Sequence, residues 1–237
     1  MRIGGATLAL AAAAAVGTGL GQEGQAPQPL EVPAAWQLDI DVQIPRPIQV
    51  VLPGDATPTT FWYLLYTVTN RYRDPQTQRP TEQIFVPDLA LYTDTGQLLR
   101  AGKKSPNVVY EAIKKRHNNP HLKDMVAITG KLLFGEDNAK DGVAIWPDFD
   151  PQAGAFDIFV GGLSGEILEV KLPKPIPRPR LDDAGKPLED KDGKILMEEV
   201  STLRLTKTVH LRYEIPGEAR ARGRAPVKLL SKKWIMR

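Results

Sequence analysis

The sequence predicts an all-β fold that contains one short helix. The chain has 21 prolines and 20 glycines but few long helical patterns, which favours sheets joined by turns. Residues 61–70 read Phe-Trp-Tyr-Leu-Leu-Tyr-Thr-Val-Thr-Asn and carry no charge. Because this run is apolar at both odd and even positions, it is typical of a strand that is covered on both faces. We expect the rest of the chain to pair with this strand or to pack over it.

Length and composition limit the classes of protein. The chain has 237 residues and is 42% hydrophobic, so it can bury a substantial core. It contains no cysteine, which excludes disulfides, thiolate metal sites and cysteine nucleophiles. The formal net charge of +3, from 31 basic and 28 acidic residues, gives no indication of nucleic-acid binding. We interpret residues 36–237 as a single domain.

The N-terminus has the pattern of a targeting segment. Arg2 precedes an Ala/Leu-rich run at 6–16, and small residues follow up to Gly21. This order predicts a signal peptide at 1–21 and a secreted or periplasmic protein. The apolar run is shorter than the ~20 residues of a membrane span, although an uncleaved N-terminal anchor is the alternative. The Gln/Pro/Ala-rich residues 22–35 are expected to be a flexible lead-in.

The first strand is predicted at 36–44, where apolar and polar residues alternate without interruption. Pro45 and Pro47 then indicate either an edge position or a switch between sheets. Strand pattern resumes at 48–52, and a turn precedes the central strand at 61–70. Another strand region follows at 84–92, and Gly96 suits the tight turn after it because glycine accepts a positive φ.

The predicted helix begins near Ser105, as N-cap, with Pro106 in its first position. Apolar residues recur at helical spacing from 108 to 113. Basic residues fill the last turn, where cations suit the helix dipole, and Asn118 follows them.

The rest of the chain reads as strands and turns. Strands are expected at 125–134 and 143–146, and a hairpin is expected to pair 156–160 with 167–172 around the turn 161–165. Residues 173–200 are interpreted as a long hairpin or loop insertion between core strands. Residues 203–215 form the longest amphipathic pattern, in which Lys207 is the one charge on the apolar side. With a last strand at 227–236, about nine strands result, a number that suits a β-sandwich.

Several segments resemble a group of uncharacterised secreted bacterial proteins and the extracellular immunoglobulin-like domains of bacterial lipoproteins. The matching segments are Tyr66-Thr-Val-Thr-Asn70, Thr93-Asp-Thr-Gly96, Gly135-Glu-Asp-Asn138, Gly142-Val-Ala-Ile-Trp146 and Gly162-Leu-Ser-Gly-Glu166. The resemblance spans about residues 60–166 and implies an immunoglobulin-like β-sandwich without enzymatic activity. The chain departs from that pattern in its helix, its long insertion and its lack of a lipid-anchor cysteine.

Motifs for catalysis are incomplete. The segment Gly162-Leu-Ser-Gly165 resembles a nucleophile elbow, but its second glycine comes one residue early and a strand pattern follows. A turn is therefore favoured over a serine nucleophile. His117 and His121 are separated by a proline, so they do not share a helical face, and exposed histidines are favoured over a metal site.

Acidic clusters are the candidates for calcium. Asp190, Asp192 and Glu199 approach the spacing of a calcium loop, but Leu188 stands at its first position. A solvated hairpin turn is the favoured interpretation. The second cluster comprises Glu136, Asp137, Asp141, Asp148 and Asp150. No other cofactor is predicted, and the paired carboxylates of a glycoside hydrolase are the remaining alternative.

Basic residues form two clusters, one around the helix and one near the C-terminus. The candidate ligand-binding residues are Lys114, Lys115, Arg116, Arg220, Arg222 and Arg224. We predict a non-catalytic binding or structural module that contacts another envelope protein. The alternatives are a polyanion- or carbohydrate-binding module that uses the basic clusters to hold a surface polymer, and a hydrolase of envelope polymers. Solvated charge that protects edge strands is the simplest interpretation of the clusters.

Overall fold

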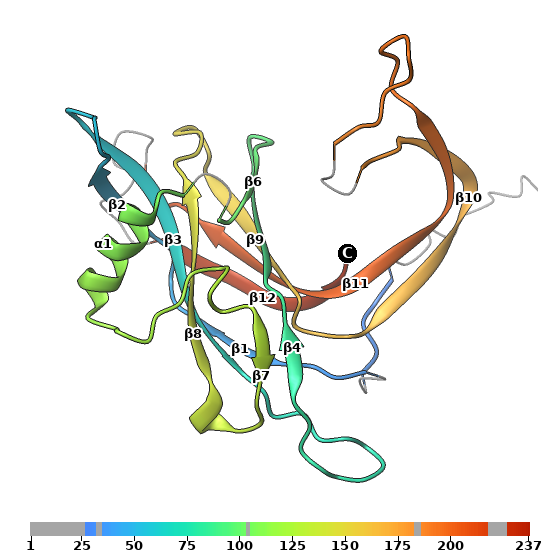
Figure 1. Cartoon of the computed structure of the whole chain (residues 1–237), viewed down its shortest axis with the longest axis horizontal. Coiled ribbons are helices and arrows are strands. Elements are labelled where there is room, and N and C mark those ends of the chain that lie inside the picture. Colours follow the sequence, from blue (N-terminus) through green and yellow to red (C-terminus); the bar gives the residue numbers. More distant parts are fainter. Residues whose placement is uncertain (1–26, 32–34, 103–104, 183–185, 218–226) are drawn as a thin grey trace, which may run out of the picture.

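The computed structural model is mostly β-structure and contains one α-helix among the residues that it describes, which confirms the predicted all-β class (Figure 1). The structure describes residues 27–31, 35–102, 105–182, 186–217 and 227–237. The predicted signal peptide and most of the predicted lead-in therefore lie outside the described residues.

The strands form two larger sheets and one small one, and every strand pair within a sheet is antiparallel. The first sheet comprises β1 (Asp39–Val42), β2 (Arg46–Val51), β3 (Pro58–Thr69) and β8 (Lys140–Pro147). The second sheet comprises β5 (Asp88–Thr93), β6 (Leu98–Arg100), β9 (Ala155–Gly161), β10 (Ile167–Pro179), β11 (Met197–Glu214) and β12 (Lys228–Met236). The short strands β4 (Gln83–Phe85) and β7 (Gly130–Leu132) pair with each other.

Strand β3 is buried on both faces, as its sequence predicts. Trp62 and Leu64 face a core cluster shared with β5, β9 and β11 of the second sheet. Tyr63 and Leu65 face a separate cluster that includes Val109 of the helix. The first sheet therefore lies between the second sheet on one side and the helix on the other.

Strands β1 and β2 follow each other along the same edge of β3. Val42 pairs with Tyr66 and Arg46 pairs with Tyr63, so this edge contains one extra residue between the two strands. Because side chains alternate along a strand, such a bulge reverses which face the even-numbered residues occupy. Ile40 accordingly packs in the core between the sheets, and Ile48 packs under the helix. The edge position predicted from the prolines is confirmed, and no switch between sheets occurs.

Helix α1 (Asn107–His117) covers the outer face of the first sheet with Val109 and Ile113. The predicted cap is displaced by one residue: Pro106 is the N-cap, and the Ser105 hydroxyl instead donates to the carbonyl oxygen of Ile145. The C-terminal end agrees with the prediction. Basic residues occupy the last turn, and the residue after it has the left-handed conformation that ends many helices.

Two predicted strands are shorter or broken in the structure. The region 84–92 divides at Pro87 into β4 and β5, which belong to different sheets. Most of 125–134 is a turn followed by the short β7, so the prediction of one strand there is wrong. The carboxylate of Asp124 accepts hydrogen bonds from the backbone N–H groups of Val126 and Ala127. These bonds stabilise a turn, so the two N–H groups do not pair with a neighbouring strand.

The predicted hairpin between 156–160 and 167–172 is also wrong. Strand β9 pairs with β5 and with β11, whereas β10 pairs with β11 alone. Val160 lies opposite Val209 and Ile167 lies opposite Thr206, so β9 and β10 follow one another along the same edge of β11. The segment 161–166 is therefore a loop inserted in a continuous edge and is not the turn of a hairpin.

Beyond this loop, β10 and β11 continue as a two-stranded ribbon that curves away from the body of the molecule (Figure 1). We call residues 167–206 the arm. Strand β12 pairs with the other edge of β11 only from Lys207 onwards, and β9 pairs with β11 only from Val209 onwards. Neither strand therefore extends along the arm. The predicted insertion at 173–200 falls within it, and the proline-rich part of that insertion is extended, as predicted.

A buried ion pair joins the base of the arm to the core. The ammonium of Lys207 lies 2.8 Å from the carboxylate of Glu166, and both side chains are more than nine-tenths buried. The other carboxylate oxygen of Glu166 accepts the backbone N–H of Leu30, and the Lys207 ammonium lies 5.4 Å from the ring centroid of Trp234. The pair therefore connects the start of the described chain, the loop before β10, and strands β11 and β12.

Removal of one partner of this pair should destabilise the protein strongly. Lys207→Ala leaves the Glu166 carboxylate buried without its cation, and we expect a loss of about 3–5 kcal/mol of unfolding free energy. The double variant Glu166→Leu/Lys207→Met removes both charges and should stay within about 1 kcal/mol of the wild type or exceed it. Denaturant titration measures both values, and equal losses in the two variants would contradict this account.

The pair also predicts a pH dependence. Burial raises the pKa of Glu166, but hydrogen bonds from Lys207 and Leu30 and the charge of Lys207 bring it below its usual value of 4.5. The contribution to stability is therefore complete above that usual value and is lost as the pH falls through it towards the folded pKa. Between about pH 6 and about pH 3, the unfolding free energy should fall more steeply in the wild type than in the double variant.

Candidate functional site

The basic residues of helix α1 form one candidate surface. Lys115 and Arg116 are exposed, and the Lys114 ammonium lies over the ring of Tyr110 at 5.7 Å from its centroid. Arg116 also donates a hydrogen bond to the carbonyl oxygen of Pro47. The other predicted ligand-binding residues, Arg220, Arg222 and Arg224, lie outside the described residues.

Sequence spacing did not reveal that Arg46 of β2 lies close to this end of the helix. The Tyr63 hydroxyl and His117 Nε2 are 2.9 Å apart and share a hydrogen bond beneath these cations. Burial lowers the pKa of His117, and the charges of Arg46 and Arg116 lower it further. The neutral imidazole is therefore favoured, and the positive charge of the surface comes from lysine and arginine.

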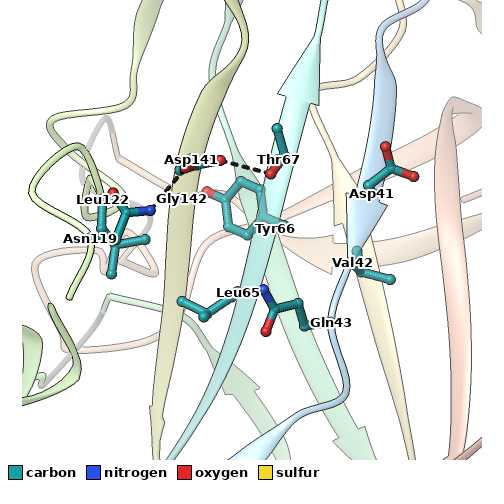
Figure 2. Close-up of a pocket in the computed structure, with 10 residues that line it drawn as sticks. All are labelled: Asp41, Val42, Gln43, Leu65, Tyr66, Thr67, Asn119, Leu122, Asp141 and Gly142. Atoms are coloured by element: carbon teal, nitrogen blue, oxygen red, sulfur yellow. Dashed lines mark hydrogen bonds between the residues drawn. The ribbon is translucent and has the colours of Figure 1, made fainter. Parts of the chain in front are cut away.

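A groove of about 290 Å³ crosses the polar part of the first sheet beyond the end of α1 (Figure 2). Asp141 occupies one side, where it accepts hydrogen bonds from Thr67 at 2.7 Å and from Asn119 at 2.9 Å. Asp41 occupies the other side and is directed away from Asp141. The two carboxylates therefore do not converge on a common point, as the acid pair of a glycoside hydrolase would require.

The acidic clusters proposed for calcium are separated in the structure. Within the described ranges, no three histidine or acidic side chains lie in an arrangement that could hold a metal ion. Glu136 pairs with Arg71, Asp148 accepts a hydrogen bond from the indole of Trp62, and Asp190 accepts backbone N–H groups of its own turn. These carboxylates stabilise local structure.

The loop with the serine motif also has a structural role. Ser164 donates its hydroxyl hydrogen to the carbonyl oxygen of Trp36 and accepts the backbone N–H of Glu166. Backbone hydrogen bonds from Leu38 to Leu163 and from Gly165 to Trp36 join the same two segments. The hydroxyl of the serine thus bonds to backbone groups on both sides.

The arm carries an unusual share of exposed apolar side chains. It contains 37 of the 194 described residues but seven of their seventeen exposed large hydrophobic residues. These seven are Ile167, Leu168, Ile176, Leu181, Ile195, Leu196 and Met197. Clustered apolar exposure of this kind marks surfaces that bind other molecules, whereas scattered apolar residues do not.

The two edges of the arm differ in hydrogen-bonding capacity. Arg180 donates its backbone N–H to Leu196 on the opposite strand, and N–H directions alternate along a strand. Pro177 and Pro179 therefore place their nitrogens, which lack hydrogen, on the outer edge of β10. The outer edge of β11 is open, because Thr206 exchanges backbone bonds with Arg237 and no described strand continues that pairing towards Met197.

Comparison of the chain with known protein families, with curated proteins and with solved structures finds no match. Among the described residues, no helix has the length and apolar character needed to cross a membrane.

Substitution of Gly162 should show how tightly the 161–166 loop is held. Gly162 has a φ of +79°, and a Cβ atom there would overlap the carbonyl oxygen of Val86. Gly162→Ala combines strain with overpacking and should cost about 2–4 kcal/mol of unfolding free energy. Gly96 has a φ of +92° with open space around it, so the matched Gly96→Ala should cost only about 1–2 kcal/mol. Equal melting temperatures would contradict the packing of the loop.

Proposed function

We propose that this protein is a non-catalytic binding module, secreted or periplasmic, that docks onto another envelope protein through the arm. The observation that carries the proposal is the two-stranded ribbon at 167–206, which extends beyond the core with exposed apolar residues and one open edge. Its partner is a protein surface that offers an apolar groove or an unpaired strand.

The stability of β-ribbons supports this proposal. An isolated two-stranded ribbon is marginally stable in water, and a third strand or a packed layer is needed to hold it firmly. Within the described residues, the arm has neither beyond Lys207. A partner strand on the open edge of β11 would supply the missing backbone hydrogen bonds, as in binding by strand addition. The prolines of β10 direct such pairing to one edge.

We also propose that the two larger sheets form an immunoglobulin-like sandwich. Two antiparallel sheets that share one core, with the chain crossing between them after β3, after β6 and after β8, support this interpretation. Many immunoglobulin-like domains act by binding, but the fold alone assigns no function. Acidic-polymer binding at the helix surface around Arg116 remains a second prediction. Hydrolysis of envelope polymers remains a third, without a site among the described residues.

Affinity capture with arm variants tests the docking surface. Mature protein is used as bait for envelope fractions, and washes at low and high salt separate apolar from ionic contacts. Ile176→Asp and Met197→Asp place charges on the exposed arm and should abolish capture of a protein that survives high salt. Val126→Asp is the control, because Val126 is also an exposed apolar residue but lies outside the arm.

The outcome is decisive only with folded variants, so circular dichroism melting accompanies each capture. Loss of the captured protein with both arm variants, and its retention with Val126→Asp, would support the proposal. Capture that is unchanged by the arm variants would exclude the arm as the docking surface.

A further inference from the structure

A second polar hollow lies on the outer face of the second sheet, where the arm begins. It has a volume of about 200 Å³ and is lined by residues of β5, β6, β9 and β11 together with Gly162 and Arg237. Its position is opposite to that of helix α1, because α1 covers the outer face of the other sheet. The hollow is therefore distinct from the basic surface of the helix.

Two arginines from different parts of the chain border this hollow. Arg100 on β6 is paired with Asp88 on β5 at 2.9 Å. The guanidinium of Arg237 lies 4.3 Å from the ring centroid of Phe159 and has no carboxylate within ion-pair distance among the described residues. The side chains of the hollow thus include two guanidinium groups and one carboxylate, and that carboxylate is paired with Arg100.

Two stacked aromatic rings hold the Arg237 side chain in place. Phe159 stacks against His210 with 4.9 Å between ring centroids and an angle of 11° between the planes. Arg237 lies over the ring of Phe159, so the aromatic face orients its planar guanidinium group. The backbone of Arg237 is fixed as well, because it exchanges two hydrogen bonds with Thr206. The arginine is therefore preorganised for an anion.

The surroundings of the hollow add to its positive character. Lys233 on β12 pairs with His210, and Arg212 lies two residues further along β11, on the same face as His210. His210 and Arg212 share the carboxylate of Asp157. On this face Arg100 is paired with Asp88 and Arg212 with Asp157, whereas Lys233 and Arg237 have no ion-pair partner among the described residues. Such a face attracts anions from solution.

We propose that this hollow binds an oxyanion, either a carboxylate or a sulfate, through Arg237 and Arg100. Guanidinium groups hold such anions with paired hydrogen bonds. The anion is supplied either by an acidic saccharide or by the free ion. Because the site is on a different face from the basic helix surface and requires neither arm edge, it stands independently of the docking function proposed above.

Isothermal titration of the whole protein with sodium sulfate, with glucuronate and with oligogalacturonate tests this site. We expect binding that weakens as salt is raised, and a loss of about tenfold or more in affinity for Arg237→Gln. Tighter binding of the oligomer than of the free ions identifies a saccharide as the source, and equal binding identifies the free anion. Absence of binding for all three probes at low salt would overturn the proposal.

Two further variants separate recognition from unfolding. Arg73→Gln is the matched control, because Arg73 also lies over a phenylalanine ring, at 4.5 Å from the centroid of Phe134, but does not line the hollow. It should bind the probes as the wild type does. Asp88→Asn removes the carboxylate that competes for Arg100 and should tighten binding about threefold or more, a gain that misfolding cannot produce. Unchanged or weaker binding by Asp88→Asn in a folded protein would contradict the proposed role of Arg100.

Discussion

The burial of β3 on both faces is the constraint on which the rest of the structure depends. Its even-numbered side chains need a second sheet to exclude water, and its odd-numbered ones need the helix. The bulge between β1 and β2 also helps to cover both faces of the first sheet. It directs the apolar residues of β1 towards the second sheet and those of β2 towards the helix. Loss of either layer would expose large aromatic side chains such as Trp62 and Tyr63, whose burial contributes several kcal/mol each.

The same constraint explains why the arm differs from the body of the molecule. Strand β11 enters the core at Lys207, where its apolar side chains contact the residues that β3 also contacts. Before that point it has only β10 as a neighbour, so its backbone and its apolar side chains remain open to a partner. The Glu166–Lys207 pair marks the boundary, because it places a charge-assisted contact where the core ends. A firm base and a weakly held ribbon suit an element that becomes ordered on binding.

Sequence patterns identified the features that local physics determines. The two-sided character of β3, the alternation before Pro45 and the isolated charge at Lys207 each follow from side-chain period, and the structure confirms them. The sequence pattern did not predict that β9 and β10 both pair with one edge of β11. Two strands that are close in sequence favour a hairpin, and the distant strand β11, which pairs with both, gives no local signal. The hollow at Arg237 was missed for a similar reason. Its residues come from 88, 100, 206 and 237, and no local motif brings them together.

Hydrogen exchange of the isolated protein tests the central claim, that a core built on β3 carries a weakly held arm. Backbone amides of β3 should exchange only through global unfolding, whereas amides of β10 and of β11 before Leu203 should exchange through local opening at much lower free energy. This result would show that the ribbon lacks the layer that a partner supplies. Protection of the arm equal to that of β3 in the isolated protein would contradict the claim, because the arm would then be stable without a partner.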